Sequence, residues 1–286
     1  MSKYSNTRTS ITMFFFITCS FYMHVLALAG SEAIKGQSLP PDIIGTWQVA
    51  KVKVDTGASR KLLYQHDDPR LKGRIFKIAP DKFVQNTPEH ISCTNPNVTV
   101  ERILAATLIK NSMSWRGIGQ EIPTPQDFEL QHDLNEQVDV LRARCGIKYW
   151  AGSLGPDDGI EGVWIIILPG DRLAIRWFDD TILILSRLPV DAKPKASFNC
   201  AKAATPVEKT ICGSVALAFF DQSVAESYLN AVRGFTEAKD FDSVKNVKAK
   251  QKKWIKKRNA CGTNVACLEK SMEEQLEVLA EPGNFY

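Results

Sequence analysis

The spacing of apolar residues changes along the chain. From Ile43 to Leu188 apolar residues alternate with polar ones or form short runs, which is typical of strands. From Ser197 to Ala280 they recur every three or four positions, as on one face of a helix. The segment 189–196 contains two prolines and several charges, which indicates a solvated linker. We therefore predict an α+β fold with a β domain over 43–188, a linker over 189–196 and a helical domain over 197–281.

The β half contains short predicted strands separated by turn residues. The last three are joined by Pro169-Gly170-Asp171 and Asp179-Asp180, so we expect them to form an antiparallel meander. Roughly eight or nine strands without a long helix predict a closed antiparallel barrel or a sandwich. The predicted strands are Gly45–Val54, Arg74–Ala79, Lys82–Asn86, Ile103–Ile109, Phe128–His132, Val138–Arg144, Val163–Leu168, Leu173–Phe178 and Ile182–Leu188.

Three amphipathic helices and one shorter helix are predicted in the second half. Thr205-Pro206-Val207-Glu208 has the pattern of a capping box with proline in the first turn, and Gly213 is expected to end the helix that it starts. The apolar rows of the longer helices are Leu217, Phe220, Val224, Tyr228 and Val232, then Val247, Trp254 and Ile255, then Leu268, Met272, Leu276 and Leu279. Such helices are marginal alone in water, so they must pack on one another.

The first 29 residues have the pattern of a secretory signal. Lys3 and Arg8 precede an apolar run over 11–26, and Ala27-Leu28-Ala29 forms a small-x-small cleavage site. We predict cleavage and a periplasmic or secreted protein of the bacterial envelope. An uncleaved anchor and lipidation of Cys19 are the alternatives. Removing this segment lowers the formal net charge from +4 to +2, so global charge predicts no partner.

Six of the seven cysteines remain after the predicted signal is removed, at positions 93, 145, 200, 212, 261 and 267. An even number in an exported chain predicts three disulfides. Cys93 and Cys145 are the only two in the β half, so we pair them. Neither a redox motif nor metal-ligand spacing occurs, since His66, His90 and His132 stand apart from the cysteine pairs. We predict no metal and no cofactor.

The four cysteines of the helical half belong to a longer pattern. Cys200 and Cys212 flank the capped helix, and a Gln-x-x-Trp-x-x-x-Arg-x-x-Cys run ends at Cys261 before Cys267-Leu268. This pattern strongly resembles the LprI-like lysozyme-inhibitor domain of exported bacterial proteins. The resemblance implies a protein that binds and blocks lysozyme without chemistry of its own. We favour the local pairs Cys200–Cys212 and Cys261–Cys267, and a crossed pairing stays open.

The first predicted strand carries a second, weaker resemblance. Gly45-Thr46-Trp47, with Arg187 near the end of the last strand, resembles the lipocalin pattern. In that family the arginine packs over the tryptophan at the closed end of an up-and-down barrel, and a small apolar ligand sits in the mouth. The alternative is a filled barrel or sandwich with Trp47, Trp164 and Trp177 in its core.

Basic residues are dense between positions 245 and 258, where no acidic residue intervenes. The run is either a solvated helix face or a surface for an anionic partner. From it we select Lys252, Lys253, Lys256, Lys257 and Arg258 as the candidate partner-binding residues. Common lysozymes are themselves cationic, so an interaction with lysozyme would rely on a lysine that pairs with the two carboxylates of the lysozyme cleft.

These observations favour an exported inhibitor or sensor of lysozyme-type muramidases that occludes the substrate cleft. One alternative is an envelope module that holds anionic cell-wall polymer or lipid headgroups through the basic helix. The other is small-ligand binding by the β half. We do not predict an enzyme, because Asp67-Asp68, Asp157-Asp158 and Asp179-Asp180 lie in turn contexts without a placed nucleophile. Nucleic-acid signatures are absent from the sequence.

Overall fold

The computed structural model describes residues 38–113, 121–146, 148–151, 162–281 and 283. The predicted signal over 1–29 and the pair Asp157-Asp158 lie outside these residues. Residues Gly36–Tyr286 form one compact unit. Within the described ranges, no helix combines the length and the apolar character that a membrane crossing requires.

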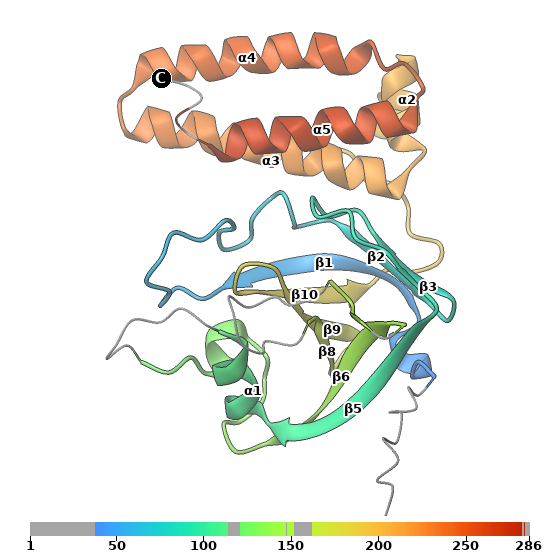
Figure 1. The fold of residues 1–286 in the computed structure, drawn as a ribbon. Helices are drawn as coiled ribbons and strands as arrows, with labels where there is room; N and C mark the ends of the chain where they lie inside the picture. Colours follow the sequence, from blue (N-terminus) through green and yellow to red (C-terminus); the bar gives the residue numbers. More distant parts are fainter. Residues whose placement is uncertain (1–37, 114–120, 147, 152–161, 282, 284–286) are drawn as a thin grey trace, which may run out of the picture. The chain divides into compact units, whose positions relative to one another are not determined.

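The described part of the N-terminal half forms one antiparallel sheet of ten strands, which curls strongly (Figure 1). The strand order is β4-β3-β2-β1-β10-β9-β8-β6-β5, and β7 pairs with β6. The first strand therefore pairs with the last, as Trp47 opposite Arg187 shows. The strands are β1 Gly45–Val54, β2 Ile75–Ala79, β3 Lys82–Gln85, β4 Cys93–Thr94, β5 Pro96–Leu104, β6 Gln137–Cys145, β7 Lys148–Tyr149, β8 Trp164–Leu168, β9 Arg172–Trp177 and β10 Thr181–Arg187.

The predicted α+β class is confirmed, with a curled half-barrel in place of a fully closed barrel or a sandwich. In the part of the chain that the structure covers, the end strands β4 and β5 do not pair with each other. A disulfide joins Cys93 of the end strand β4 to Cys145 of β6, the strand next to β5. This is the pairing that the sequence predicts.

Two predicted strands are wrong. The segment Ile103–Ile109 contains the end of β5 and then the helix α1, Ala105–Ser112. Ala105, Leu108 and Ser112 are buried at helical spacing, so tertiary packing selects helix over strand for this apolar run. Phe128 ends a 3-10 helix, Pro125–Phe128, that a capping box between Thr124 and Asp127 starts. Strand β5 was not predicted, and it begins at Pro96, a residue that sheets accept at a strand end or edge.

Both faces of the central strands are buried. In β10, Leu183 and Leu185 join the cluster that all the longer strands share, whereas Ile182 and Ile184 pack with α1 on the other face. The shared cluster contains the rings of Phe76, Phe83, Trp47, Trp150 and Trp177. Four edge-to-face contacts among these rings have centroid distances of 5.0 to 6.3 Å. The side chains therefore occupy the inside of the curl, as the filled alternative requires.

The arginine of the lipocalin-like pattern packs where that resemblance places it. The Arg187 guanidinium lies 4.1 Å from the centroid of the Trp47 ring, and its Nη1 donates to the Ile44 carbonyl at 2.8 Å. Gly45 has a φ of +150°, and a Cβ there would lie 2.5 Å from Arg187 Nη1. A glycine is therefore required at this position. Arg187 therefore packs on Trp47, but among the described residues the inside of the curl is filled by side chains, and the lipocalin resemblance is not supported further.

The described residues of the second half form four α-helices: α2 Pro206–Cys212, α3 Val215–Glu237, α4 Phe241–Asn259 and α5 Val265–Ala280. Their apolar rows meet in one cluster that includes Leu217, Trp254 and Met272. Of the residues predicted for these rows, Ile255 is an exception, since it is 38% exposed. The packing of α3, α4 and α5 supplies the core that each helix lacks alone.

Candidate partner-binding surface

The residues of the Gln-Trp-Arg-Cys run point into the helical half. Gln251 Oε1 accepts from Gln275 Nε2 at 2.9 Å, and Trp254 Nε1 donates to the Ser271 carbonyl at 3.0 Å. Because these positions follow one another at helical spacing, they line the side of α4 that faces α5. The run therefore builds the domain, and a partner must contact other residues.

Arg258 lies in the same row and forms an internal ion pair. Its Nη1 is 3.3 Å from Asp221 Oδ1, and the two side chains are 12% and 5% exposed. Burial lowers the pKa of Arg258, while Asp221 and Glu208 act in the opposite direction. The guanidinium also lies 5.2 Å from the Trp254 ring centroid. The structure thus gives Arg258 a place in the core packing.

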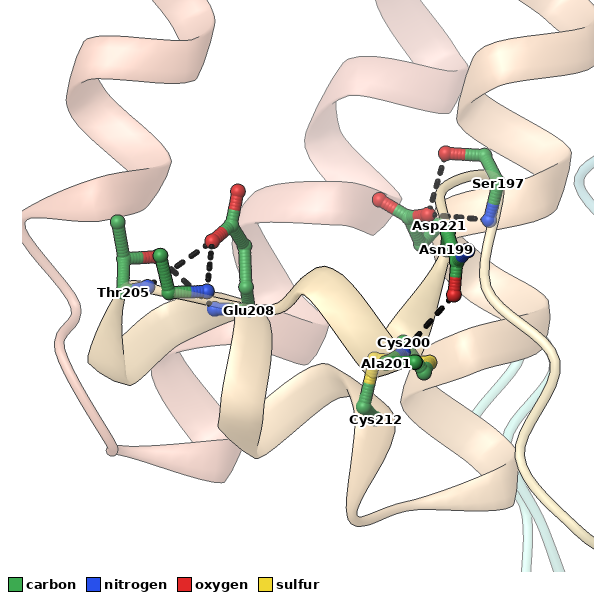
Figure 2. Close-up of a disulfide and its surroundings, with 9 residues drawn as sticks. Ser197, Asn199, Cys200, Ala201, Thr205, Glu208, Cys212 and Asp221 are labelled. Atoms are coloured by element: carbon green, nitrogen blue, oxygen red, sulfur yellow. Dashed lines mark hydrogen bonds between the residues drawn. A yellow bond between two sulfur atoms is a disulfide. The ribbon is translucent and has the colours of Figure 1, made fainter.

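Asp221 also holds the segment that enters the helical half (Figure 2). Its Oδ2 accepts from the backbone nitrogen of Ser197 at 2.8 Å and from Ser197 Oγ at 2.6 Å. Next to this contact, Asn199 Oδ1 accepts from the Ala201 nitrogen at 2.9 Å, and Cys200 is joined to Cys212. One carboxylate therefore connects the entering segment, α3 and α4.

The predicted capping box at the start of α2 is present (Figure 2). Thr205 Oγ1 accepts from the Glu208 nitrogen at 3.2 Å, and Glu208 Oε2 accepts from the Thr205 and Ala204 nitrogens at 2.9 Å. These backbone donors lower the pKa of Glu208. The capping box therefore fixes the start of α2, and the Cys200–Cys212 disulfide ties the end of the same helix to the segment before it.

The four lysines of the predicted site lie together on the outer side of α4. Lys252, Lys253, Lys256 and Lys257 are all exposed, and their spacing places them on adjoining parts of the helix surface. We call these four residues the lysine face. Lys257 Nζ contacts Glu274 Oε2 of α5 at 2.9 Å. The structure thus groups four of the five predicted residues and separates Arg258 from them.

The lysine face continues toward the turn between α4 and α5. The Cys261–Cys267 disulfide closes this turn, where Gly262 has a φ of +57°. A hollow of about 490 Å³ beside it is lined in part by Lys257, Lys270 and Glu274. Sequence spacing did not connect Lys270 with Lys257, because the two residues belong to different helices and meet only through the hairpin.

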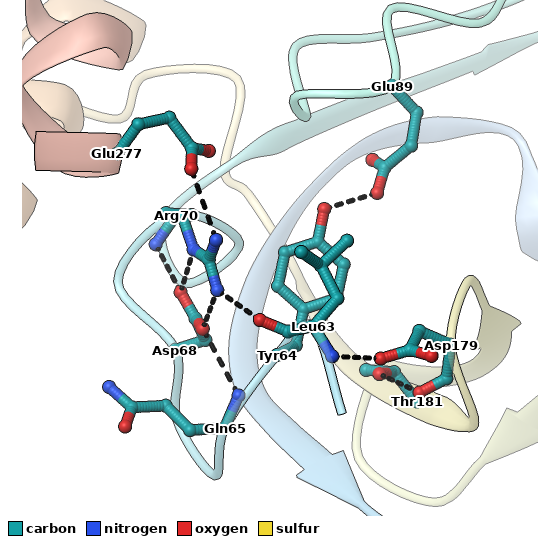
Figure 3. A network of polar contacts seen from close by, with 9 residues as sticks. All are labelled: Leu63, Tyr64, Gln65, Asp68, Arg70, Glu89, Asp179, Thr181 and Glu277. Carbon is teal, nitrogen blue, oxygen red and sulfur yellow. Dashed lines mark hydrogen bonds and ion pairs between the residues drawn. The ribbon is translucent and has the colours of Figure 1, made fainter. Parts of the chain in front are cut away.

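The acidic pairs in the described residues have structural partners. Asp68 binds the Arg70 guanidinium through both carboxylate oxygens, at 3.0 and 2.8 Å (Figure 3). Asp180 Oδ1 contacts Arg176 Nη2 at 3.0 Å, and both of these side chains are buried. Within the described part of the chain, no group of three or more His, Cys, Asp or Glu is arranged to hold a metal ion.

Comparison with known proteins supports the resemblance of the helical half. The model of the family described as lysozyme inhibitor LprI matches residues 200–281. The match includes both disulfides of this half and all four of its α-helices, and it leaves the sheet outside. No curated protein and no solved structure matches the chain. The helical part of this chain is therefore similar to the lysozyme inhibitor LprI family over residues 200–281.

Proposed function

We propose that this protein is exported, binds lysozyme-type muramidases through its helical half and blocks their substrate cleft. The family match over residues 200–281 carries this proposal, because lysozyme inhibition is the function of the family by its description. The three disulfides are consistent with export, since such bonds persist in oxidising compartments. The predicted signal over 1–29 supports the same location.

The lysine face supplies the contact that we propose for the cleft. A lysozyme cleft presents two carboxylates, and an exposed ammonium group on a rigid helix can pair with them. Lys256 and Lys257 lie in the last turns of α4, next to the disulfide-closed hairpin. A rigid hairpin loses little conformational freedom on insertion, which favours binding.

Replacing Lys252, Lys253, Lys256 and Lys257 together by glutamine is expected to weaken inhibition at least about fourfold. Each exposed ion pair contributes about 0.2–1 kcal/mol, and about 1.4 kcal/mol corresponds to a factor of ten. The inhibition constant is measured by titrating the full chain into a lytic assay with several lysozymes.

A matched control carries the same loss of four charges elsewhere. Lys193, Lys195, Lys245 and Lys248 are exposed, and the first two lie in the linker. Their replacement by glutamine should leave the inhibition constant within about twofold of the original, since isolated surface charges act weakly. Equal losses in the two variants would contradict a role for the lysine face. The absence of both inhibition and binding with every lysozyme would contradict the proposed function itself.

The lysine face also supports a second function, the holding of anionic cell-wall polymer or lipid headgroups. Polyanion binding would weaken steeply as ionic strength rises, because the Debye length falls from about 10 Å at 0.1 M salt to about 3 Å at 1 M. Retention on envelope fractions, compared between the original protein and the fourfold glutamine variant, tests it. Unchanged retention of the variant would count against this function.

A further inference from the structure

Charges of opposite sign meet where the sheet half contacts α3 and α5. The helices contribute four glutamates, which we call the acidic face: Glu226 of α3 and Glu269, Glu273 and Glu277 of α5. The three on α5 are four residues apart, so they lie along one side of that helix. Opposite them, the segment between β1 and β4 contributes Arg70, Lys72, Arg74 and His90.

Three direct contacts join the two sets. Arg70 Nη1 lies 3.1 Å from Glu277 Oε2, while Asp68 holds the same guanidinium from the other side (Figure 3). Lys72 Nζ is 3.7 Å from Glu226 Oε1. His90 Nε2 is 2.8 Å from Glu273 Oε1. The basic segment thus follows the row of glutamates along its length.

Arg74 occupies the buried centre of this junction. It is 0% exposed, its Nη2 donates to Ser223 Oγ at 2.9 Å, and its guanidinium carbon lies 3.4 Å from the Phe220 ring centroid. Its Nε and Nη1 are buried without a hydrogen-bond partner. Burial lowers the pKa of Arg74 to about 9, although Glu273 and Glu269 act in the opposite direction. A charge that is desolvated and only partly paired makes the junction costly to keep closed.

Burial also disfavours the charged form of two glutamates in the acidic face. It raises the pKa of Glu269 and of Glu273, against the favourable charges of Arg74 and His90. The carboxylates are thus also partly removed from water without complete pairing. The junction therefore matches charges but does not satisfy them fully.

No apolar cluster of the described residues spans the junction. The two clusters around the sheet contain only residues of the sheet half, and the third contains only residues from the helical half and the segment leading into it. A hollow of about 570 Å³ also lies between the segment 65–72 and α3. Polar interfaces within a chain separate more readily than a shared core. Val190, Asp191 and Lys193 of the linker are exposed, so separation of the two halves would break no buried side-chain contact of these residues.

We infer that the acidic face is a docking surface for a cationic protein, and that the basic segment of the sheet half covers it as an intramolecular competitor. The segment shows which chemistry fits: guanidinium, ammonium and imidazole groups along a row of carboxylates. Naming a cationic lysozyme as the partner rests on the proposed function. A cationic lysozyme would be repelled by the lysine face. It would be attracted by the acidic face, which becomes accessible once the two halves separate.

The test compares binding by an opened variant with binding by the original full chain. In the opened variant, Lys72→Glu and His90→Asp place negative charges opposite Glu226 and Glu273. The two side chains are 36% and 64% exposed, and His90 has a φ of +49°, which aspartate tolerates. The probes are a cationic lysozyme and cytochrome c, and the dissociation constant is measured at low ionic strength. The opened variant should bind at least one probe at least about tenfold more tightly than the original chain.

Two further variants in the opened background identify the surface. Adding Glu269→Gln, Glu273→Gln and Glu277→Gln should abolish the gain. Adding Glu274→Gln, a single change on α5 outside the acidic face at a glutamate that pairs with Lys257, should keep it. The proposal is overturned if the opened variant gains no affinity for either probe, or if the triple glutamine variant keeps the gain. Circular dichroism verifies that each variant is folded.

Carbodiimide cross-linking measures whether the basic segment covers the acidic face in the original chain. The reagent condenses a neighbouring ammonium and carboxylate into an amide with loss of water, so Lys72 and Glu226 should become joined. A saturating probe should reduce this cross-link severalfold, and an unchanged yield would overturn the competition.

Binding of cytochrome c without any effect on lysis would support the docking surface while contradicting the proposed function. The fourfold glutamine variant of the lysine face should leave binding at the acidic face unchanged, which separates the two sites.

Discussion

Replacing Cys93 and Cys145 by alanine is expected to lower the free energy of unfolding of the sheet half by about 4 kcal/mol. The disulfide joins residues 52 positions apart, and the chain entropy that a cross-link removes from the unfolded state grows with the length of the closed loop. It also joins β4 to β6, two strands that are not neighbours in the sheet. Urea denaturation followed by tryptophan fluorescence measures the change.

The matched control removes the disulfide that closes the shortest of the three loops. Cys261 and Cys267 are six positions apart, and their replacement by alanine should cost about 2 kcal/mol by the same relation. The two losses should therefore differ by about a factor of two. A Cys93 and Cys145 variant that loses less than about 1 kcal/mol would show that the hydrogen-bonded strand pairs hold the curled sheet without this cross-link.

The second large effect is expected at Asp221. Its change to asparagine should destabilise the helical half by about 3 kcal/mol, because Arg258 then keeps a buried positive charge without its counter-charge. The carboxylate also accepts two hydrogen bonds from Ser197, so the entering segment should loosen as well. Chemical denaturation followed by far-ultraviolet circular dichroism reports the loss, since the helices dominate that signal.

An exposed ion pair on the same helices provides the comparison. Lys257 and Glu274 are 71% and 47% exposed, so Lys257→Gln should change stability by less than about 1 kcal/mol. A double-mutant cycle with Arg258→Met should show that most of the loss at Asp221 depends on Arg258. If Asp221→Asn were as mild as Lys257→Gln, the pair would be solvated in solution and Arg258 would again be a candidate for partner binding.

The helical half could be predicted well from its sequence because its signals are local. The capping box of Thr205 and Glu208, the apolar rows and the short cysteine spacings each act within a few turns of chain. The Gln-Trp-Arg-Cys run also identified the family that the comparison supports. Hydrogen bonds within a helix connect near neighbours, so the sequence pattern contains most of the information.

The sheet half was predicted less completely. The strands β1, β2, β3, β6, β8, β9 and β10 were expected close to their observed positions, since they alternate or are bounded by turn residues. The apolar run that became α1 has no such boundary, and its helix forms because Leu108 and Ile109 pack against the outer face of the sheet. Short apolar runs are ambiguous between helix and strand until their packing partners are known.

Sequence alone predicted strands followed by helices, the cysteine pairs that the structure contains and the resemblance of residues 200–281 to the lysozyme inhibitor LprI family. Only the tertiary structure separated Arg258 from the lysine face, filled the inside of the curled sheet and set the basic segment of residues 70–90 against the acidic face of α3 and α5. The physical reason is distance along the chain. Periodicity and capping report on neighbours within about one turn, whereas burial and charge pairing depend on side chains that folding brings together from far apart.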